Sequence, residues 1–73
     1  MKVKIRIDTG TDARQFVDIA TKAKGPVFIT DGDGLKVSAK SLLGTLYAME
    51  FDELWCESEY DIYHAIEKFI VIE

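Results

Sequence analysis

The chain has 73 residues, of which 48% are hydrophobic, so it is long enough for one small domain with a single packed core. Its net charge of −4 disfavours non-specific nucleic-acid binding, and its one cysteine, Cys56, excludes a disulfide framework or a zinc cluster built within one chain. The first residues, "MKVKIRID", alternate between charged and apolar side chains, which is unlike a signal peptide or an anchor, and the run "FIVI" is too short to cross a bilayer. We therefore expect a soluble cytoplasmic protein that binds no membrane.

The first two predicted elements are a strand and a helix. Apolar and charged side chains alternate over residues 2–7, which is the period of a strand with one buried face. A helix over Asp12 to Ala23 is predicted next, because its apolar residues recur every three or four positions. These residues are Phe16, Ile19, Ala20 and Ala23. The "KGP" at residues 24–26 ends this helix.

The middle of the chain predicts a hairpin followed by a short helix. Residues 27–38 contain two runs of strand-forming residues around "DGDG". Asp-Gly is the common hairpin dipeptide, and the later ligands of a calcium loop are missing, so we interpret "DGDG" as a turn. Ser41 then precedes a short helix over residues 42–49.

The run "DELWCES", residues 52–58, alternates again and predicts a fourth strand. Leu54 and Cys56 should point into the core, where Cys56 would be inert. Trp55 should point to the face that no helix covers. It either lies over the lysine stems of a neighbouring strand or marks an interface with another protein.

A third helix is predicted over residues 58–69, "SEYDIYHAIEKF", with Ser58 and Asp61 resembling a capping box. Its apolar stripe would consist of Ile62, Ala65, Ile66 and Phe69. The element order is therefore β-α-β-β-α-β-α. We expect a single α+β domain over residues 1–73, an open-faced sandwich in which three helices cover one face of a four-stranded antiparallel sheet.

This order, together with two short motifs, resembles the HPr family, the small phosphocarriers of the bacterial sugar phosphotransferase system. The run "TGTDARQ" is similar to the family's active-site pattern Gly-x-His-Ala-Arg-Pro, and "AKSLLGTLYA" is similar to its regulatory Lys-Ser-x-x-Gly segment. The matching residues are Gly10, Ala13, Arg14, Lys40, Ser41 and Gly44. The resemblance covers nearly the whole chain and implies the HPr fold.

The chain departs from the family at the residue that accepts phosphate. Asp12 replaces the phosphoaccepting histidine, and Gln15 replaces the following proline. The single histidine, His64, matches no active-site position of the family, and we expect it to be a surface or core residue. Asp12 is interpreted as a helix N-cap that forms a capping box with Gln15. Two alternatives stay open: Asp12 accepts phosphate as an acyl phosphate, or it mimics a phosphorylated state towards a partner.

Three further features could contact a partner. Arg14 either pairs with Asp12 or a C-terminal carboxylate, or holds a phosphate or acidic partner. Ser41 is interpreted as a helix cap. The resemblance also makes Ser41 the candidate for phosphorylation by the family's serine kinase. In the family, the phosphorylated protein binds a transcriptional repressor. A short helix cannot bury the three leucines that follow, so core packing and an exposed docking patch both stay open for them. They are Leu42, Leu43 and Leu46.

The resemblance implies a regulatory or binding module without catalytic residues, metal or cofactor, similar to the histidine-less HPr paralogues known as Crh. Its partners would be proteins: HPr kinase, a transcriptional regulator, phosphotransferase components or a second copy of the chain. Two alternatives are a divergent phosphocarrier that uses Asp12 or another residue and a scaffold with an unrelated partner.

Overall fold

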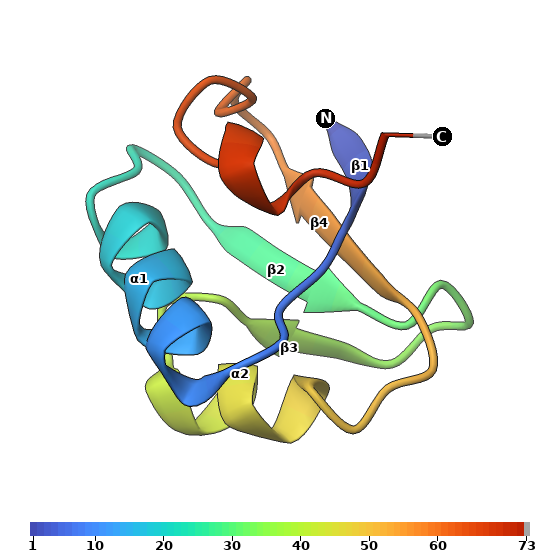
Figure 1. Ribbon diagram of the computed structural model, residues 1–73. Coiled ribbons are helices and arrows are strands. Elements are labelled where there is room, and N and C mark those ends of the chain that lie inside the picture. Colours follow the sequence, from blue (N-terminus) through green and yellow to red (C-terminus); the bar gives the residue numbers. More distant parts are fainter. Residues whose placement is uncertain (73) are drawn as a thin grey trace.

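The computed structural model describes residues 1–72, which form an α+β domain built on a four-stranded antiparallel sheet (Figure 1). The strands lie in the order β1-β4-β2-β3. Two α-helices and one short 3-10 helix, η1, complete the fold. The elements are β1 (Lys2–Ile5), α1 (Gly10–Thr21), β2 (Val27–Thr30), β3 (Lys36–Ser38), α2 (Leu42–Ala48), β4 (Leu54–Ser58) and η1 (Glu67–Phe69).

The strand register gives the sheet one apolar face and one mixed face. Val3 of β1 pairs with Cys56 of β4, Cys56 pairs with Ile29 of β2, and Ile29 pairs with Val37 of β3, so these four residues form a row across the whole sheet. Both α1 and α2 contribute side chains to the core that this row lines. The predicted inward and outward positions of β1 and β4 are therefore confirmed.

The β2–β3 hairpin forms at the predicted turn. The amide of Asp31 donates to the carbonyl of Leu35 at 3.2 Å, and Asp31 Oδ1 accepts from the amides of Asp33 and Leu35 at 2.7 and 3.2 Å. Gly32 and Gly34 have φ angles of +88° and +115°, which side chains other than glycine rarely adopt. The "DGDG" run thus forms a turn, in which Asp31 Oδ1 accepts two of the hydrogen bonds.

The third α-helix that the sequence predicted over residues 58–69 does not form. Residues 63–66 form hydrogen-bonded turns, and η1 follows them. Ser58 does not cap a helix, because it is the last residue of β4 and its hydroxyl donates to the carbonyl of Tyr60. Asp61 Oδ1 instead accepts from the amide of Tyr63 at 3.0 Å, which closes a local turn.

The end of the chain covers the free edge of β1, which helps to explain why no helix continues there. The amide of Arg6 donates to the carbonyl of Phe69 at 2.8 Å, and the amide of Val71 donates to the carbonyl of Lys4 at 3.0 Å. Ile5 and Ile70 form an antiparallel bridge between these segments. The extended backbone that these bonds need is incompatible with a helix beyond Phe69, and it protects an otherwise unpaired sheet edge.

We expect the stability of the protein to fall when the pH rises above 9. Cys56 is fully buried, and burial raises the pKa of its thiol from 9.0 to about 11, an effect that the nearby N-terminal ammonium partly opposes. Because the folded protein holds the thiol protonated, this contribution to stability is complete below pH 9. It is lost as the pH approaches 11, by about 2–3 kcal/mol.

Urea unfolding monitored at several pH values measures this loss. The Cys56→Ala variant is the control, because it lacks the titrating thiol and should show a shallower fall over the same pH range. Equal slopes for the two proteins would contradict the assignment.

Candidate functional site

The start of α1 is capped three residues earlier than the sequence predicts. Thr9 is the N-cap, and its hydroxyl accepts from the amide of Asp12 at 3.0 Å. Asp12 lies inside the first turn, where its Oδ2 accepts from the amide of Asp8 at 3.3 Å. Gln15 takes no part in the cap, because its side-chain oxygen accepts from the ammonium of Lys68. The interpretation of Asp12 as N-cap with Gln15 as its partner is therefore wrong.

Asp12 and Arg14 lie on different sides of α1. Two residues along a helix are about 200° apart, so their side chains cannot face each other. Asp12 lines a cavity together with Arg6 and Lys68, beside the end of the chain. The side chain of Arg14 is exposed, and among residues 1–72 it forms no hydrogen bond or ion pair. The proposed pair between Asp12 and Arg14 does not form.

The start of α2 agrees with the sequence prediction. Ser41 is the N-cap, and its Oγ accepts from the amide of Gly44 at 3.1 Å. A Cβ atom on Gly44 would lie 3.3 Å from the carbonyl oxygen of Ser38, so glycine lets the helix approach the preceding strand closely. The ammonium of Lys40 lies 3.4 Å from the carbonyl oxygen of Ala23, and it is therefore directed at the end of α1.

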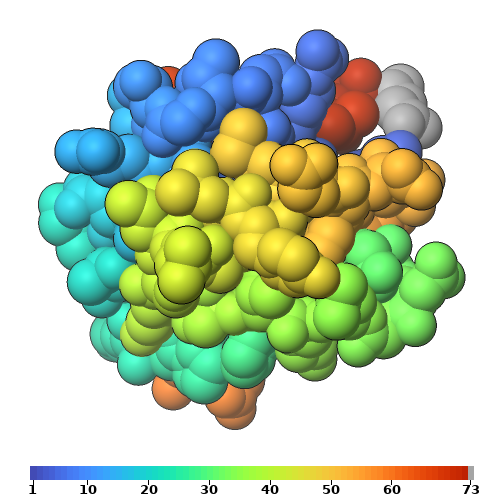
Figure 2. Space-filling view, turned by 90° about the horizontal axis from the view of Figure 1, so that it is seen from below, coloured from blue at the N-terminus to red at the C-terminus, as the bar shows by residue number. Residues whose placement is uncertain are grey.

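Arg14 of α1 and two leucines of α2, Leu42 and Leu46, line the same cavity. A cavity of about 590 Å³ is lined by one stripe of α1 and one of α2: Gly10, Thr11, Arg14, Leu42 and Leu46. In Figure 2, the residues of α2 spread across the face of the molecule directly beside those at the start of α1. The cavity has hydroxyl and guanidinium groups on one wall and apolar groups on the other. Such a surface can hold an acidic group next to an apolar side chain.

The three leucines and Tyr47 form an exposed apolar patch on α2. Leu43 is 79% exposed and Tyr47 is 56% exposed, whereas Leu42 and Leu46 are about two-fifths exposed. The residues of α2 that are buried in the core are Thr45 and Ala48. Single domains seldom expose a contiguous apolar patch of this kind, so this patch is the candidate for contact with another protein.

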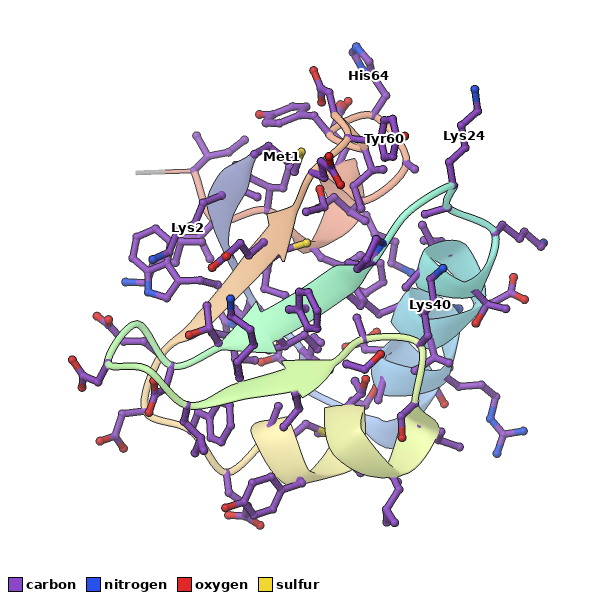
Figure 3. All side chains as sticks on the ribbon, turned by 180° about the vertical axis from the view of Figure 1, so that it is seen from behind. Met1, Lys2, Lys24, Lys40, Tyr60 and His64 are labelled. Atoms are coloured by element: carbon purple, nitrogen blue, oxygen red, sulfur yellow. The ribbon has the colours of Figure 1, made fainter. Side chains whose placement is uncertain are left out.

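On the face of the sheet that the helices leave uncovered, two lysines pack over aromatic rings. The ammonium of Lys2, labelled in Figure 3, lies 5.7 Å from the centre of the Trp55 ring, and that of Lys36 lies 5.1 Å from the centre of the Phe28 ring. Lys36 also donates to Glu57 Oε1 at 3.0 Å, and this hydrogen bond lowers the pKa of the Glu57 carboxyl. Trp55 thus packs with a lysine of the neighbouring strand, one of its two predicted arrangements.

In Figure 3, His64 lies at the end of the molecule opposite α2, whose residues line the Arg14 cavity. Its side chain is exposed, and its Nδ1 lies 3.3 Å from Glu67 Oε2. Sequence reasoning missed two residues at the start of α1: Thr9 as the cap and Thr11 as part of the cavity wall. The spacing of Thr9 and Asp12 is that of a capping box and could have identified the cap.

No family model, curated protein or solved structure matches this chain. Within residues 1–72, no group of three or more histidine, cysteine, aspartate or glutamate side chains is arranged to hold a metal ion. None of the helices in the same range is long and apolar enough to cross a membrane.

The capping assignment can be tested by stability. We expect Thr9→Ala to lower the free energy of unfolding by about 1 kcal/mol, because the amide of Asp12 loses its acceptor. Gln15→Ala, at an exposed position of the same helix, should change the free energy of unfolding by less than about 0.5 kcal/mol. Urea denaturation of both variants measures the difference. A larger loss for Gln15→Ala would contradict the observed cap.

Proposed function

We propose that the chain is an HPr-like module that binds protein partners and does not carry phosphate. The cavity shared by the start of α1 and α2 supports this most directly. It joins Arg14, from the motif that resembles the HPr active site, to Leu42 and Leu46, from the motif that resembles the regulatory segment. The two motifs thus contribute to one surface, although Arg14 and Ser41 are 27 residues apart in the sequence.

The position of Asp12 supports the loss of phosphocarrier function. Its carboxylate lies on the side of α1 away from Arg14 and accepts a hydrogen bond from the amide of Asp8. Transfer of a phosphoryl group to Asp12 would need the negative charge of the acyl phosphate to be balanced, and Arg14 is not in place to do so. The two cations that line the cavity beside Asp12 are directed elsewhere: Arg6 donates to Asp8, and Lys68 donates to Gln15. The competing interpretation is a divergent phosphocarrier that uses Asp12, and it would need one of these cations to turn towards the phosphate.

Regulation would act through Ser41. Its hydroxyl is at the exposed start of α2 and precedes the docking patch directly. A phosphate on this oxygen would add about two negative charges beside Leu42 and Leu43. It would change which partners the patch binds. The proposed partners are an HPr kinase, a transcriptional regulator or phosphotransferase components in the cytoplasm, with a second copy of the chain as a further possibility; membranes and nucleic acids are not among them.

The chain should not accept phosphate from enzyme I of the phosphotransferase system, because no histidine occupies the start of α1. Incubation with enzyme I and labelled phosphoenolpyruvate measures transfer, with an ordinary HPr as the positive control. Asp12→His should recover partial transfer at most, since the side chain at this position points away from Arg14. Transfer to the unchanged protein at a rate similar to that of HPr would refute the proposal and favour the divergent phosphocarrier.

An HPr serine kinase with ATP should modify Ser41 and no other hydroxyl. Mass spectrometry after incubation detects the added phosphate, and Ser41→Ala should remain unmodified. As a matched control, Ser38→Ala removes an exposed hydroxyl three residues away and should leave modification unchanged. If the chain stays unmodified, or if Ser41→Ala is modified equally, Ser41 serves only as a helix cap and the docking patch serves an unrelated partner.

A further inference from the structure

The apolar patch on α2 has charged groups of opposite sign at its two ends. The patch consists of Leu42, Leu43, Leu46 and Tyr47, and α2 itself contains no charged side chain. In Figure 1, the start of α1 lies beside the first residues of α2, and the loop that follows α2 lies at the other end of the helix, next to the β2–β3 turn. The charges at the two ends of the patch therefore come from different parts of the fold.

The first end of the patch is cationic. Arg14 lines a cavity with Leu42 and Leu46, and its exposed side chain forms no hydrogen bond or ion pair within residues 1–72. Lys40, the other cation near this end, is directed at the carbonyl oxygen of Ala23, which lies 3.4 Å from its ammonium. Arg14 is therefore the cation at this end that is open to a group on a second molecule.

The second end of the patch is acidic. Glu50 and Asp52 line one cavity, and these two exposed carboxylates form no ion pair in the part of the chain that the structure describes. The amide of Glu50 donates to the carbonyl of Tyr47 at 3.1 Å, so the helical turn continues to Glu50. Glu50 follows Tyr47 by three residues and Leu46 by four, which places it on the same side of α2 as the patch.

A patch with this order of charges is complementary to itself. When two copies of α2 pack antiparallel about a two-fold axis, the Arg14 end of each copy meets the Glu50 end of the other, so that both ends are paired at once. A partner whose charges are all of one sign would leave one end of the patch without a counter-charge. The distribution of charge therefore favours a second copy of the chain.

We propose that two copies of the chain associate through α2 as an antiparallel, two-fold symmetric dimer. Leu43 of each copy packs on the apolar patch of the other, and Arg14 of each copy pairs with Glu50 of the partner subunit. A short helix offers an interface near the lower bound for specific association, about 500 Å² per copy, which is about a tenth of the 4650 Å² surface of the chain. The dimer is therefore weak and reversible.

The inference rests on the proposed function in one respect, because it takes the apolar patch on α2 as a surface for protein contact. It adds that a second copy covers this patch when no other partner is bound. Partner binding and self-association therefore compete for the same residues.

Sedimentation equilibrium of the full chain, between about 10 µM and about 1 mM, tests the proposal. We expect a monomer–dimer equilibrium with a dissociation constant in this range. Leu43→Ser should weaken association roughly a hundredfold or more, because each dimer loses two buried leucine side chains. Ile72→Ser is the matched control: it removes a similarly exposed apolar side chain outside the patch and should leave association unchanged.

Charge reversal tests the antiparallel arrangement. Arg14→Glu and Glu50→Arg should each weaken association roughly tenfold, because two ion pairs in each dimer become repulsive contacts. Lys24→Glu makes the same change in net charge as Arg14→Glu at the end of the molecule opposite α2 (Figure 3), and it should leave association unchanged. An equimolar mixture of the Arg14→Glu and Glu50→Arg variants should dimerise again, because both contacts of the mixed dimer join a carboxylate to a guanidinium.

Several outcomes would overturn the proposal. They are a chain that stays monomeric up to about 1 mM, equal effects of Leu43→Ser and Ile72→Ser, equal effects of Arg14→Glu and Lys24→Glu, and a mixture of the two charge-reversal variants that associates no better than either alone. Modification of Ser41 by an HPr serine kinase does not need a second copy. A chain that is modified but stays monomeric therefore contradicts the dimer alone, and a chain that dimerises but is not modified contradicts the proposed kinase alone.

Discussion

The burial of Phe16 against Phe69 sets the rotation of α1, and the positions of the candidate site residues follow from that rotation. Both rings are buried, and they meet edge to face with their centres 5.2 Å apart. Because Asp12 precedes Phe16 by four residues, it lies on nearly the same side of the helix, towards the end of the chain. Arg14 precedes Phe16 by two residues and therefore lies on the opposite side, towards α2.

The apolar surface of α2 follows from which of its residues are buried. The helix has seven residues, and its inward side is taken by Thr45 and Ala48, two small side chains that let the helix lie close to its neighbours. The larger residues, Leu43, Leu46 and Tyr47, are left outside. The outer surface lies next to Arg14, so a cation and an apolar patch adjoin where the start of α1 meets α2.

Much of this arrangement follows from the sequence. Alternation predicted the buried faces of the strands over residues 2–7 and 52–58, and the Asp-Gly pairs predicted the turn between β2 and β3. Ser41 was predicted as a cap because its side chain acts locally, on an amide three residues away. The opposite orientations of Asp12 and Arg14 were also open to prediction, because they depend on helix geometry alone.

The last segment could not be predicted in this way. Ile66 and Phe69 are buried, as the helical stripe required, but a spacing of three residues suits a 3-10 helix as well as an α-helix. The choice depends on distant partners: β1, whose free edge pairs with the chain beyond Phe69, and Met1, which binds the turn at Ile62.

The central claim is that the chain binds its partners through the surface where the start of α1 meets α2. Titration of the ¹⁵N-labelled protein with an unlabelled HPr kinase tests it most directly, by mapping which amide signals shift. The account predicts that shifts concentrate at Gly10, Thr11, Arg14, Leu42 and Leu46. Shifts confined to the strand face around Trp55, or no shift with excess kinase, would contradict it.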